Sequence, residues 1–307
     1  MSDIRSTTFA VVVTFHPCRT ELTRLLSAIV PQVKGVVVVD NGSPAHQVDW
    51  LKEVEGLHFI PLRTNLGLAA GHNIGINYAR NLGARYVVLL DQDSEPAEDM
   101  VVRLHEALAL AERDGYRVAA VGPNYVDERH NNPPPFIRVE GLRLKRVGAA
   151  DDTFVAVDYL ISSGSLIPID VLEIVGGMRE ELFIDYVDIE WGLRAKRHGF
   201  QTIGSMRARM RHRLGETPVR WGGRSIPMHT PLRHYYHFRN AVWLYRQSWV
   251  PLNWKLVDGY RLALKFIFYS LYGRPPLQHL RMMTLGVWHG LSGRMHHPQR
   301  TIPHLSS

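Results

Sequence analysis

The feature that most constrains the fold is a series of five apolar runs within the first 121 residues, each of strand length. The runs are rich in Val and Leu and lie at 9–14, 36–39, 58–62, 86–90 and 118–121. Helix-like stretches at 20–30, 71–81 and 96–114 lie between them. This alternation predicts an α/β sheet with several parallel strands, and the continuous apolar character predicts strands covered on both faces.

Polar residues follow the ends of four runs, where open α/β sheets bind their ligands. Asp91 and Asp93 are carboxylates one residue apart, a spacing that suits binding of one hard cation, Mg²⁺ or Mn²⁺, together with a diphosphate. A turn and helix cap at 93–96 is the alternative, because Asp and Ser are common at helix N-termini. The other strand-end segments are Thr14-Phe15-His16, Asp40-Asn41-Gly42-Ser43 and Arg63-Thr64-Asn65.

Glycine patterns argue against two common α/β classes. No G-x-G-x-x-G follows the first run and no G-x-x-x-x-G-K-[ST] occurs, which disfavours dinucleotide-binding oxidoreductases and P-loop enzymes. Instead, Gly67, Gly71 and Gly75 recur every four residues. That spacing lines one helix face with small groups and favours close packing over phosphate binding.

The formal net charge of +7 hides two parts of opposite sign. Residues 1–190 carry 17 Lys and Arg against 27 Asp and Glu, a balance of −10, whereas residues 191–307 carry 19 against 2, a balance of +17. The second part therefore predicts a polyanionic partner such as phosphates, anionic lipid or nucleic acid. Nucleic acid is disfavoured, because the acidic first part would repel its backbone and no nucleic-acid motif occurs.

Length and composition limit the architecture and the compartment. A chain of 307 residues with 45% apolar composition can form one large domain, or one domain with an elaborated tail. The single Cys18 provides no internal disulfide and predicts a reducing compartment. The first eight residues lack the features of a signal peptide, so export by that route is not expected. The Pro-rich, basic segment 131–148 predicts a loop near the site.

The last part of the chain has a helical pattern, with candidate helices at 232–249, 253–272 and 277–291. Asp258, Arg261 and Lys265 interrupt the apolar character of the second helix, so it is not expected to span a membrane. The aromatic residues in and just before this helix fit a lipid interface and a packed core equally well. These are Trp249, Trp254, Phe266, Phe268, Tyr269 and Tyr272.

A second acidic segment places Asp185, Asp188 and Glu190 just before or within a helix start. Acids at that position can cap the helix or complement its dipole. One of them could instead be a general base.

In this order and spacing, the segments resemble the inverting glycosyltransferases of family 2, most closely their rhamnosyltransferase branch. The resemblance runs from about residue 9 to residue 240. It rests on Val13-Thr14-Phe15, Val39-Asp40-Asn41-Gly42-Ser43, Asn65-Leu66-Gly67, Gly71-His72-Asn73, Leu89-Leu90-Asp91-Gln92-Asp93-Ser94, Ser162-Ser163-Gly164, Phe183-Ile184-Asp185-Tyr186-Val187-Asp188-Ile189-Glu190-Trp191, His212, Gly215 and Tyr235-Tyr236-His237-Phe238-Arg239-Asn240.

The resemblance implies a GT-A fold, a Rossmann-like mixed sheet flanked by helices. It implies a catalytic domain over 1–230, with a donor half at about 1–125 and an acceptor half at about 126–230. A basic helical extension over 231–307, expected to associate with a membrane surface, would follow.

Site roles also follow from the resemblance. Asp188 is the implied general base, although Val187 stands where the family has Glu, and Asp185 is the rival. Asp93 and His212 would bind the metal, Mg²⁺ or Mn²⁺. The implied donor nucleotide contacts are Thr14, Phe15, Asp40, Asn41, Asn65, Gly67, Asn73, Asp91 and Gln92. The implied acceptor or phosphate contacts are Ser163, Asp185, Trp191, Arg233 and Arg239, with helix-start packing an equal alternative for the tyrosines next to Arg239.

The implied activity is a metal-dependent single displacement that moves L-rhamnose from dTDP-L-rhamnose to a bacterial cell-surface glycan, such as a lipopolysaccharide, an O-antigen or a lipid-linked glycan. The expected place is the cytoplasm, at the inner face of the cytoplasmic membrane. A UDP-sugar donor is the alternative within the class. A nucleic-acid-binding protein and a degenerate binding scaffold are the disfavoured alternatives from other classes.

Overall fold

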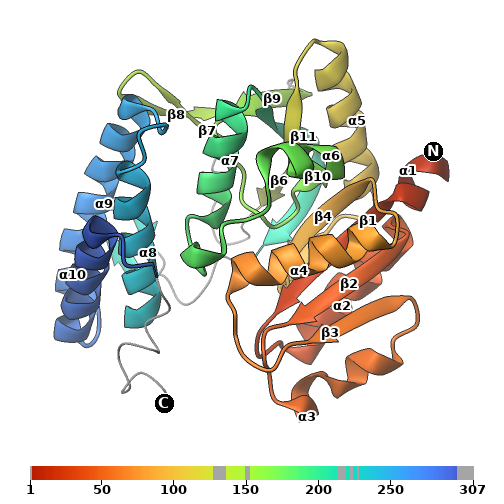
Figure 1. Ribbon diagram of the computed structural model, residues 1–307, viewed down its shortest axis with the longest axis horizontal. Helices are drawn as coiled ribbons and strands as arrows, with labels where there is room; N and C mark the ends of the chain where they lie inside the picture. Colours follow the sequence, from red (N-terminus) through yellow and green to blue (C-terminus); the bar gives the residue numbers. More distant parts are fainter. Residues whose placement is uncertain are drawn as a thin grey trace.

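A mixed sheet of nine strands forms the centre of the described structure (Figure 1). The structure is a computed structural model and describes residues 2–126, 136–148, 153–212, 219–221, 224–226 and 228–295. The strand order is β3-β2-β1-β4-β10-β6-β11-β5, with β9 also paired to β11. The strands are β1 (Thr8–Thr14), β2 (Gly35–Asp40), β3 (Leu57–Pro61), β4 (Tyr86–Asp91), β5 (Ser94–Pro96), β6 (Val118–Val126), β9 (Phe154–Val157), β10 (Leu166–Pro168) and β11 (Gln201–His212).

The first four strands are parallel, as the sequence predicts. Strand β10 runs antiparallel to both β4 and β6, and β11 runs parallel to β6, so the sheet is mixed. The parallel register aligns Thr14 at the end of β1 with Asp40 at the end of β2, and Val13 with Asp91 at the end of β4. One edge of the sheet therefore collects the polar strand ends.

Helices cover both faces of this sheet (Figure 1). Phe9 and Val11 of β1 belong to one core cluster and Ala10 and Val12 to the other, because side chains alternate along a strand. One face packs on α4 (Leu68–Asn81), α6 (Ile169–Val175) and α7 (Val187–Arg197), and the other on α2 (Arg19–Ile29) and α5 (Met100–Arg113). The remaining helical elements of this part are α1 (Ser2–Thr7), α3 (Ala45–Val48) and the 3-10 turns Val30–Gln32, Asp49–Glu53 and Glu180–Leu182.

Helix α4 lies unusually close to the sheet. A Cβ atom on Gly71 would lie 2.8 Å from Val13, and one on Gly75 would overlap Val11. The four-residue glycine spacing therefore serves close packing, as the sequence predicts. This approach brings the N-terminal end of α4 to the polar edge of the sheet.

Two local expectations are wrong. Residues 136–147 form a hairpin of β7 (Phe136–Glu140) and β8 (Arg143–Val147) instead of a loop, while 131–135 lie outside the described residues. The buried Phe136 side chain anchors the hairpin, since it occupies the space over Gly204. Residues 94–96 form β5, which pairs with β11, and α5 begins only at Met100. A further short hairpin joins β12 (Val219–Trp221) to β13 (Arg224–Ile226).

The last part of the chain folds into α8 (Pro231–Tyr245), α9 (Leu252–Tyr272) and α10 (Pro276–Ser292), close to the predicted ranges. Helix α8 ends four residues earlier than expected, and Pro251 precedes the start of α9. Trp254, Phe268 and Tyr269 are buried in a core cluster with α8 and α10, so these aromatics pack within the protein. Across the described residues, every helix is too short or too polar to cross a membrane. A domain boundary near residue 230 stays a prediction.

Candidate active site

Hydrogen bonds join the ends of β1 and β2. The Thr14 hydroxyl donates to Asp40 Oδ1 at 2.9 Å, and the Ser43 hydroxyl and amide donate to Oδ1 and Oδ2 at 2.7 Å each. Asp40 is almost fully buried. Because a carboxylate has about four acceptor positions, these three bonds leave it little capacity for a ligand. We therefore expect Asp40 to shape the pocket wall and to offer at most one bond to a nucleotide.

The next loop is shaped by two asparagines. The Asn41 side chain donates to the Gly67 carbonyl at 3.1 Å and accepts from the Leu66 amide at 3.2 Å, and Asn65 Oδ1 accepts from the Gly67 amide at 2.9 Å. Gly67 has φ +91°, and a Cβ atom there would overlap Phe183. Both asparagines thus fix the conformation of this loop. The absence of a side chain at Gly67 allows Phe183 to lie against the start of α4.

The segment Asp91-Gln92-Asp93 continues from β4 and is tied to two neighbouring elements. The Phe15 amide donates to Gln92 Oε1 at 2.8 Å, and Gln92 Nε2 donates back to the Phe15 carbonyl at 3.2 Å. On the other side, the Asp91 amide donates to the Ser163 hydroxyl at 3.1 Å, and this hydroxyl lies 2.5 Å from that of Ser94. Ser163 is therefore placed to orient the acidic segment.

Asp188, the second residue of α7, lies near these strand ends. Burial raises the pKa of the Asp188 carboxyl to about 6, the Ile189 amide opposes the shift with a 2.9 Å hydrogen bond, and repulsion by Asp185 and Asp91 adds to it. Burial raises the pKa of the Tyr125 hydroxyl, and the charge of Asp188 adds to this shift. The fold thus brings an acid from a helix start close to the acid at the end of β4. A half-buried carboxyl with a raised pKa is well suited to take up a proton.

The chain just before Asp188 has an uncommon backbone conformation. Phe183, Asp185 and Tyr186 all have positive φ, between +61° and +66°, which costs free energy in residues other than glycine. The Phe183 carbonyl accepts from the Leu68 amide at 2.7 Å, which fixes this segment over the N-terminal end of α4. We call residues 183–186 the base loop, because they lead directly into the helix that bears Asp188.

Two adjacent residues of α8 hold the base loop through hydrogen bonds to its main chain and to the residues just before it. Asn240 Nδ2 donates to the carbonyls of Leu182, Ile184 and Asp185 at 2.8, 2.8 and 2.9 Å. Arg239 is fully buried and donates to the carbonyls of Glu181 and Leu182. A buried guanidinium with carbonyl partners fits structural support better than phosphate binding. The sequence pattern pointed to this Arg-Asn pair, but Asn240 itself was missed as a site residue.

The other acids of this segment have separate partners. Glu190 is fully buried and forms a two-pronged ion pair with Arg194, at 2.8 and 2.9 Å, so it is not available as a base. Asp185 pairs with Arg233 of α8 at 3.3 Å. Arg233 is 41% exposed, so it remains a candidate phosphate contact.

Two further residues expected at the site serve packing. Trp191 is buried and donates to the Gly176 carbonyl at 2.9 Å. Asn73 joins α4 to the loop after α6 through Met178, whose amide donates to Asn73 Oδ1 and whose carbonyl accepts from Asn73 Nδ2, both at 2.8 Å. These bonds do not support direct ligand roles for either residue.

The acidic segment was also expected to bind a metal. Mg²⁺ usually takes one or two carboxylates and completes its shell with substrate phosphates and water, so Asp91 and Asp93 fit a cation shared with a diphosphate. Among the described residues, no group of three His, Cys, Asp or Glu side chains could hold a metal alone. The backbone of His212 pairs with Ser94, one residue from Asp93, whereas the His212 side chain and Gly215 lie outside the described part.

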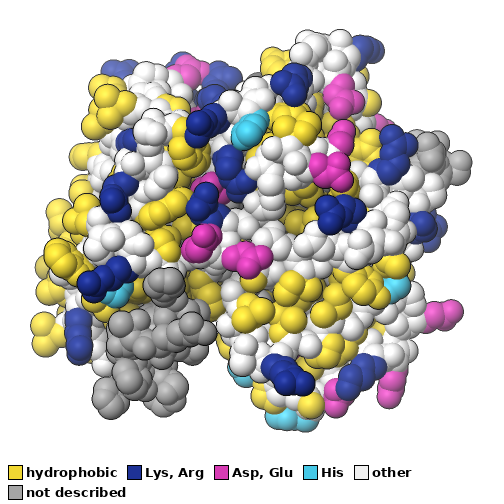
Figure 2. All heavy atoms as spheres, viewed as in Figure 1, with side chains coloured by type: hydrophobic (Ala, Val, Ile, Leu, Met, Phe, Trp, Pro, Cys, Tyr) yellow, Lys and Arg dark blue, Asp and Glu magenta, His cyan; other side chains and the backbone are white. Residues whose placement is uncertain are grey.

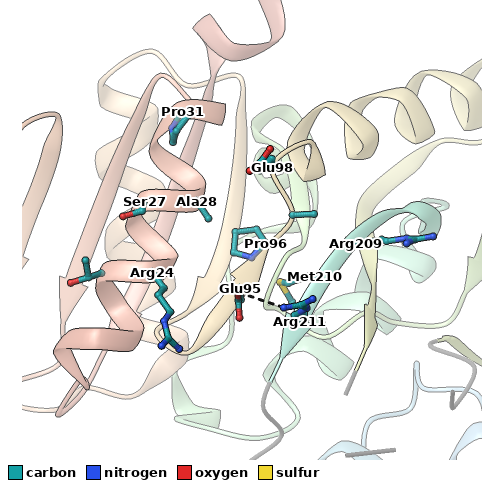
Figure 3. Close-up of a pocket in the computed structure, with 12 residues that line it drawn as sticks. Arg24, Ser27, Ala28, Pro31, Glu95, Pro96, Glu98, Arg209, Met210 and Arg211 are labelled. Carbon is teal, nitrogen blue, oxygen red and sulfur yellow. Dashed lines mark ion pairs between the residues drawn. The ribbon is translucent and has the colours of Figure 1, made fainter. Parts of the chain in front are cut away.

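An open hollow of about 1040 Å³ lies between α2 and the β5–β11 pair (Figure 3). Figure 3 shows Arg24 and Ser27 of α2 across from Glu95 and Arg211, which form an ion pair at 3.9 Å. None of the expected site residues lines this hollow. We therefore do not assign it to the donor.

Together, the mixed sheet, the carboxylates at its strand ends and the nearby acid on α7 define a glycosyltransferase of the GT-A type. Solved structures have the same fold. Staphylococcus aureus TarS 1–349 in complex with UDP-GlcNAc has a TM-score of 0.59 and 16% identity, over 94% of this chain and 82% of that one. GalNAc-T7 with UDP, GalNAc and Mn²⁺ has a TM-score of 0.56 and 15% identity, over 86% of this chain and 57% of that one.

Sequence relatives narrow this class to one family. Residues 10–174 match the profile of glycosyl transferase family 2. The dTDP-rhamnosyl transferase RfbF of Shigella flexneri is 37% identical over 251 residues, which are 81% of this chain and 83% of the relative. The galactofuranosyltransferase GlfT1 of Mycolicibacterium smegmatis is 28% identical over 89% of this chain and 92% of its own. The chain belongs to glycosyl transferase family 2 and is a glycosyltransferase.

Proposed function

We propose that the enzyme transfers L-rhamnose from dTDP-L-rhamnose to a hydroxyl group of a bacterial cell-surface glycan, with inversion at the anomeric carbon. The observation that carries the chemistry is the proximity of Asp188, with its raised pKa, to Asp91 at the end of β4. The identity with a dTDP-rhamnosyl transferase supports the choice of donor.

The reaction is a single displacement. The Asp188 carboxylate accepts the proton of the acceptor hydroxyl, and the acceptor oxygen forms a bond to the anomeric carbon. The bond from that carbon to the diphosphate oxygen breaks, and dTDP leaves with the electron pair. Thr14, Phe15, Asp91 and Gln92 line the nucleotide side, since their chain segments meet at the sheet edge.

Asp93, with His212 as a second candidate ligand, would hold Mg²⁺ or Mn²⁺. A bound cation of this kind would neutralise charge on the departing diphosphate. We test this assignment with Asp93→Asn against Glu95→Gln, a matched change two residues further on. Asp93→Asn should raise the Mn²⁺ concentration needed for half-maximal donor hydrolysis by at least about tenfold, the loss of one charged ligand. Equal Mn²⁺ dependence of the two variants would reject Asp93 as the ligand.

The choice of donor is tested by comparing two nucleotide sugars. Hydrolysis of dTDP-rhamnose is compared with that of UDP-glucose at equal concentrations and with Mn²⁺ present. We expect a higher kcat/KM for dTDP-rhamnose. A preference for UDP-glucose would replace the proposed donor with a UDP-sugar while leaving the reaction type intact.

The acceptor and the place of action are inferred from the basic part of the chain. Residues 191–307 carry 19 Lys and Arg against 2 Asp and Glu, which suits a lipid-linked or phosphate-bearing glycan at the inner face of the cytoplasmic membrane. In this proposal residues 1–230 perform catalysis and 231–307 form the extension that meets the acceptor side.

A further inference from the structure

The exposed apolar side chains of this protein are concentrated on two helices. Of the seventeen large hydrophobic side chains that are exposed among the described residues, eleven lie on α9 and α10. Scattered apolar residues are normal on a protein surface, but a concentration of this kind marks an interaction site. Figure 2 shows hydrophobic side chains gathered along the edge of the molecule that α9 and α10 form in Figure 1.

Helix α9 has two apolar faces. Its inner face packs Trp254, Leu262, Phe268 and Tyr269 against the core. Its outer face carries residues three or four positions apart, the spacing of one helical stripe, and each is 49–69% exposed. This outer stripe consists of Leu252, Leu256, Tyr260, Leu264, Ile267 and Leu271. Its spacing is that of a buried helix face, but these side chains are exposed within the part of the chain that the structure describes.

Helix α10 adds a second exposed set, Leu277, Leu280, Trp288 and Leu291, again at helical spacing. Trp288 is 59% exposed and Tyr260 of the outer stripe 68%. Trp and Tyr are the residues that favour the boundary between lipid and water, because their rings are apolar and carry one polar group. The composition of both helices therefore fits a bilayer interface.

The charge of the extension fits an anionic surface. Residues 231–295 carry nine Lys and Arg and one acid, Asp258. Asp258 is not available to outside cations, because it accepts hydrogen bonds from Tyr186 at 2.7 Å and Tyr245 at 2.6 Å. Arg274, Arg281 and Arg294 are exposed on or beside α10. A second copy of this chain would bring the same positive charges together, which disfavours self-association through this face.

We propose that the outer faces of α9 and α10 bind an anionic lipid bilayer, with the helices in the interface plane. The apolar stripe enters the boundary between headgroups and acyl chains while the arginines contact lipid phosphates. This deepens the proposed function, which places the enzyme at a membrane, but it adds the exposed apolar stripe as its own observation and is measurable without sugar transfer. Helix α8 supports the base loop and also packs against α10, so α8 connects the proposed membrane face to the segment that precedes Asp188.

The test is sedimentation of the full chain with vesicles of phosphatidylcholine, with and without phosphatidylglycerol. The stripe variant carries Leu256→Ser, Leu264→Ser and Ile267→Ser. Its matched control carries Tyr78→Ser, Tyr116→Ser and Ile174→Ser, three exposed apolar residues on the catalytic part. The charge variant carries Arg274→Gln, Arg281→Gln and Arg294→Gln. Unchanged Tm and donor hydrolysis in solution verify that each variant is folded.

We expect binding of the wild type to anionic vesicles and little binding to neutral ones. The stripe variant should lose at least about tenfold in partitioning, and the charge variant about fivefold per arginine, while the control binds as the wild type does. The proposal is overturned if the wild type ignores anionic vesicles or if the stripe variant binds normally. It is also overturned if the wild type is a dimer that the stripe changes dissociate, without vesicle binding.

Discussion

The side-chain amide of Asn240 in α8 donates a 2.9 Å hydrogen bond to the main-chain carbonyl of Asp185, three residues before Asp188. The same amide bonds two more carbonyls of this segment, which contains three residues with positive φ. A strained backbone persists only where its surroundings hold it. Asn240 is therefore a positioning residue for Asp188, although it lies more than fifty residues further along the chain.

Replacing this amide tests that role. Asn240→Ala removes one donor from each of three carbonyls, of which Leu182 keeps Arg239 and the Ile184 amide as donors, and this should destabilise the protein by about 1–3 kcal/mol. The kcat for transfer should fall with little change in dTDP binding, because the proposed nucleotide contacts lie at the strand ends. Thermal unfolding and steady-state kinetics measure both effects, with the exposed Asn81→Ala as the control. A variant with wild-type Tm and kcat would show that the base loop holds its own shape.

The pH profile reports the protonation of Asp188. A general base acts only when deprotonated, so kcat/KM should rise with pH, reach half its plateau near pH 6 and stay flat above. Because the Asp185 charge contributes to the raised pKa, Asp185→Asn should move this limb to lower pH. The test measures kcat/KM of the wild type and of Asp185→Asn between pH 4.5 and 8. An identical limb in both proteins would exclude coupling between the two acids.

Substitution of the base should cost activity and increase stability at the same time. Asp188→Asn should reduce transfer roughly 10²–10⁴-fold. The folded pKa near 6 lies above the ordinary value of 3.8, so the native state binds this proton more tightly than the unfolded chain. Stability from this group is present at low pH and is lost as pH rises through 6.

The variant should therefore be more stable than the wild type by about 1–3 kcal/mol at pH 8, a difference that shrinks towards pH 4.5. Denaturant titrations at both pH values give the comparison. Equal stability at pH 8 would mean that burial does not raise the pKa of Asp188 in the folded protein.

Glu190 should behave in the opposite way, as a structural acid. Glu190→Gln breaks a buried ion pair with Arg194, which should cost about 3 kcal/mol of stability. Activity per folded molecule, measured well below the Tm, should stay within a few-fold of wild type. The control is Glu181→Gln, whose side chain is 57% exposed and 3.9 Å from Arg179, and we expect a change below about 1 kcal/mol. A loss of catalysis without a loss of stability would return Glu190 to the list of candidate bases.

The sequence by itself determined the elements and the chemistry at their ends. Hydrophobic periodicity and the polar residues that end an element are local properties of the sequence. Neighbouring residues were therefore enough to predict the strands that end in Thr14, Asp40 and Asp91 and the close packing through Gly71. Local pattern failed at 136–147, where a hairpin depends on Phe136 filling space beside a distant strand.

Only the tertiary structure decided which side chains meet. The sequence predicts Trp191 and Arg239 as acceptor or phosphate contacts, but both side chains are buried and bond to main-chain carbonyls. Asn240, in contrast, holds the base loop by hydrogen bonds. The raised pKa of Asp188 likewise comes mainly from burial, a condition that arises only when α7 packs on the sheet. Such contacts join residues far apart in the chain, and no local periodicity records them, because burial and charge are properties of the surroundings.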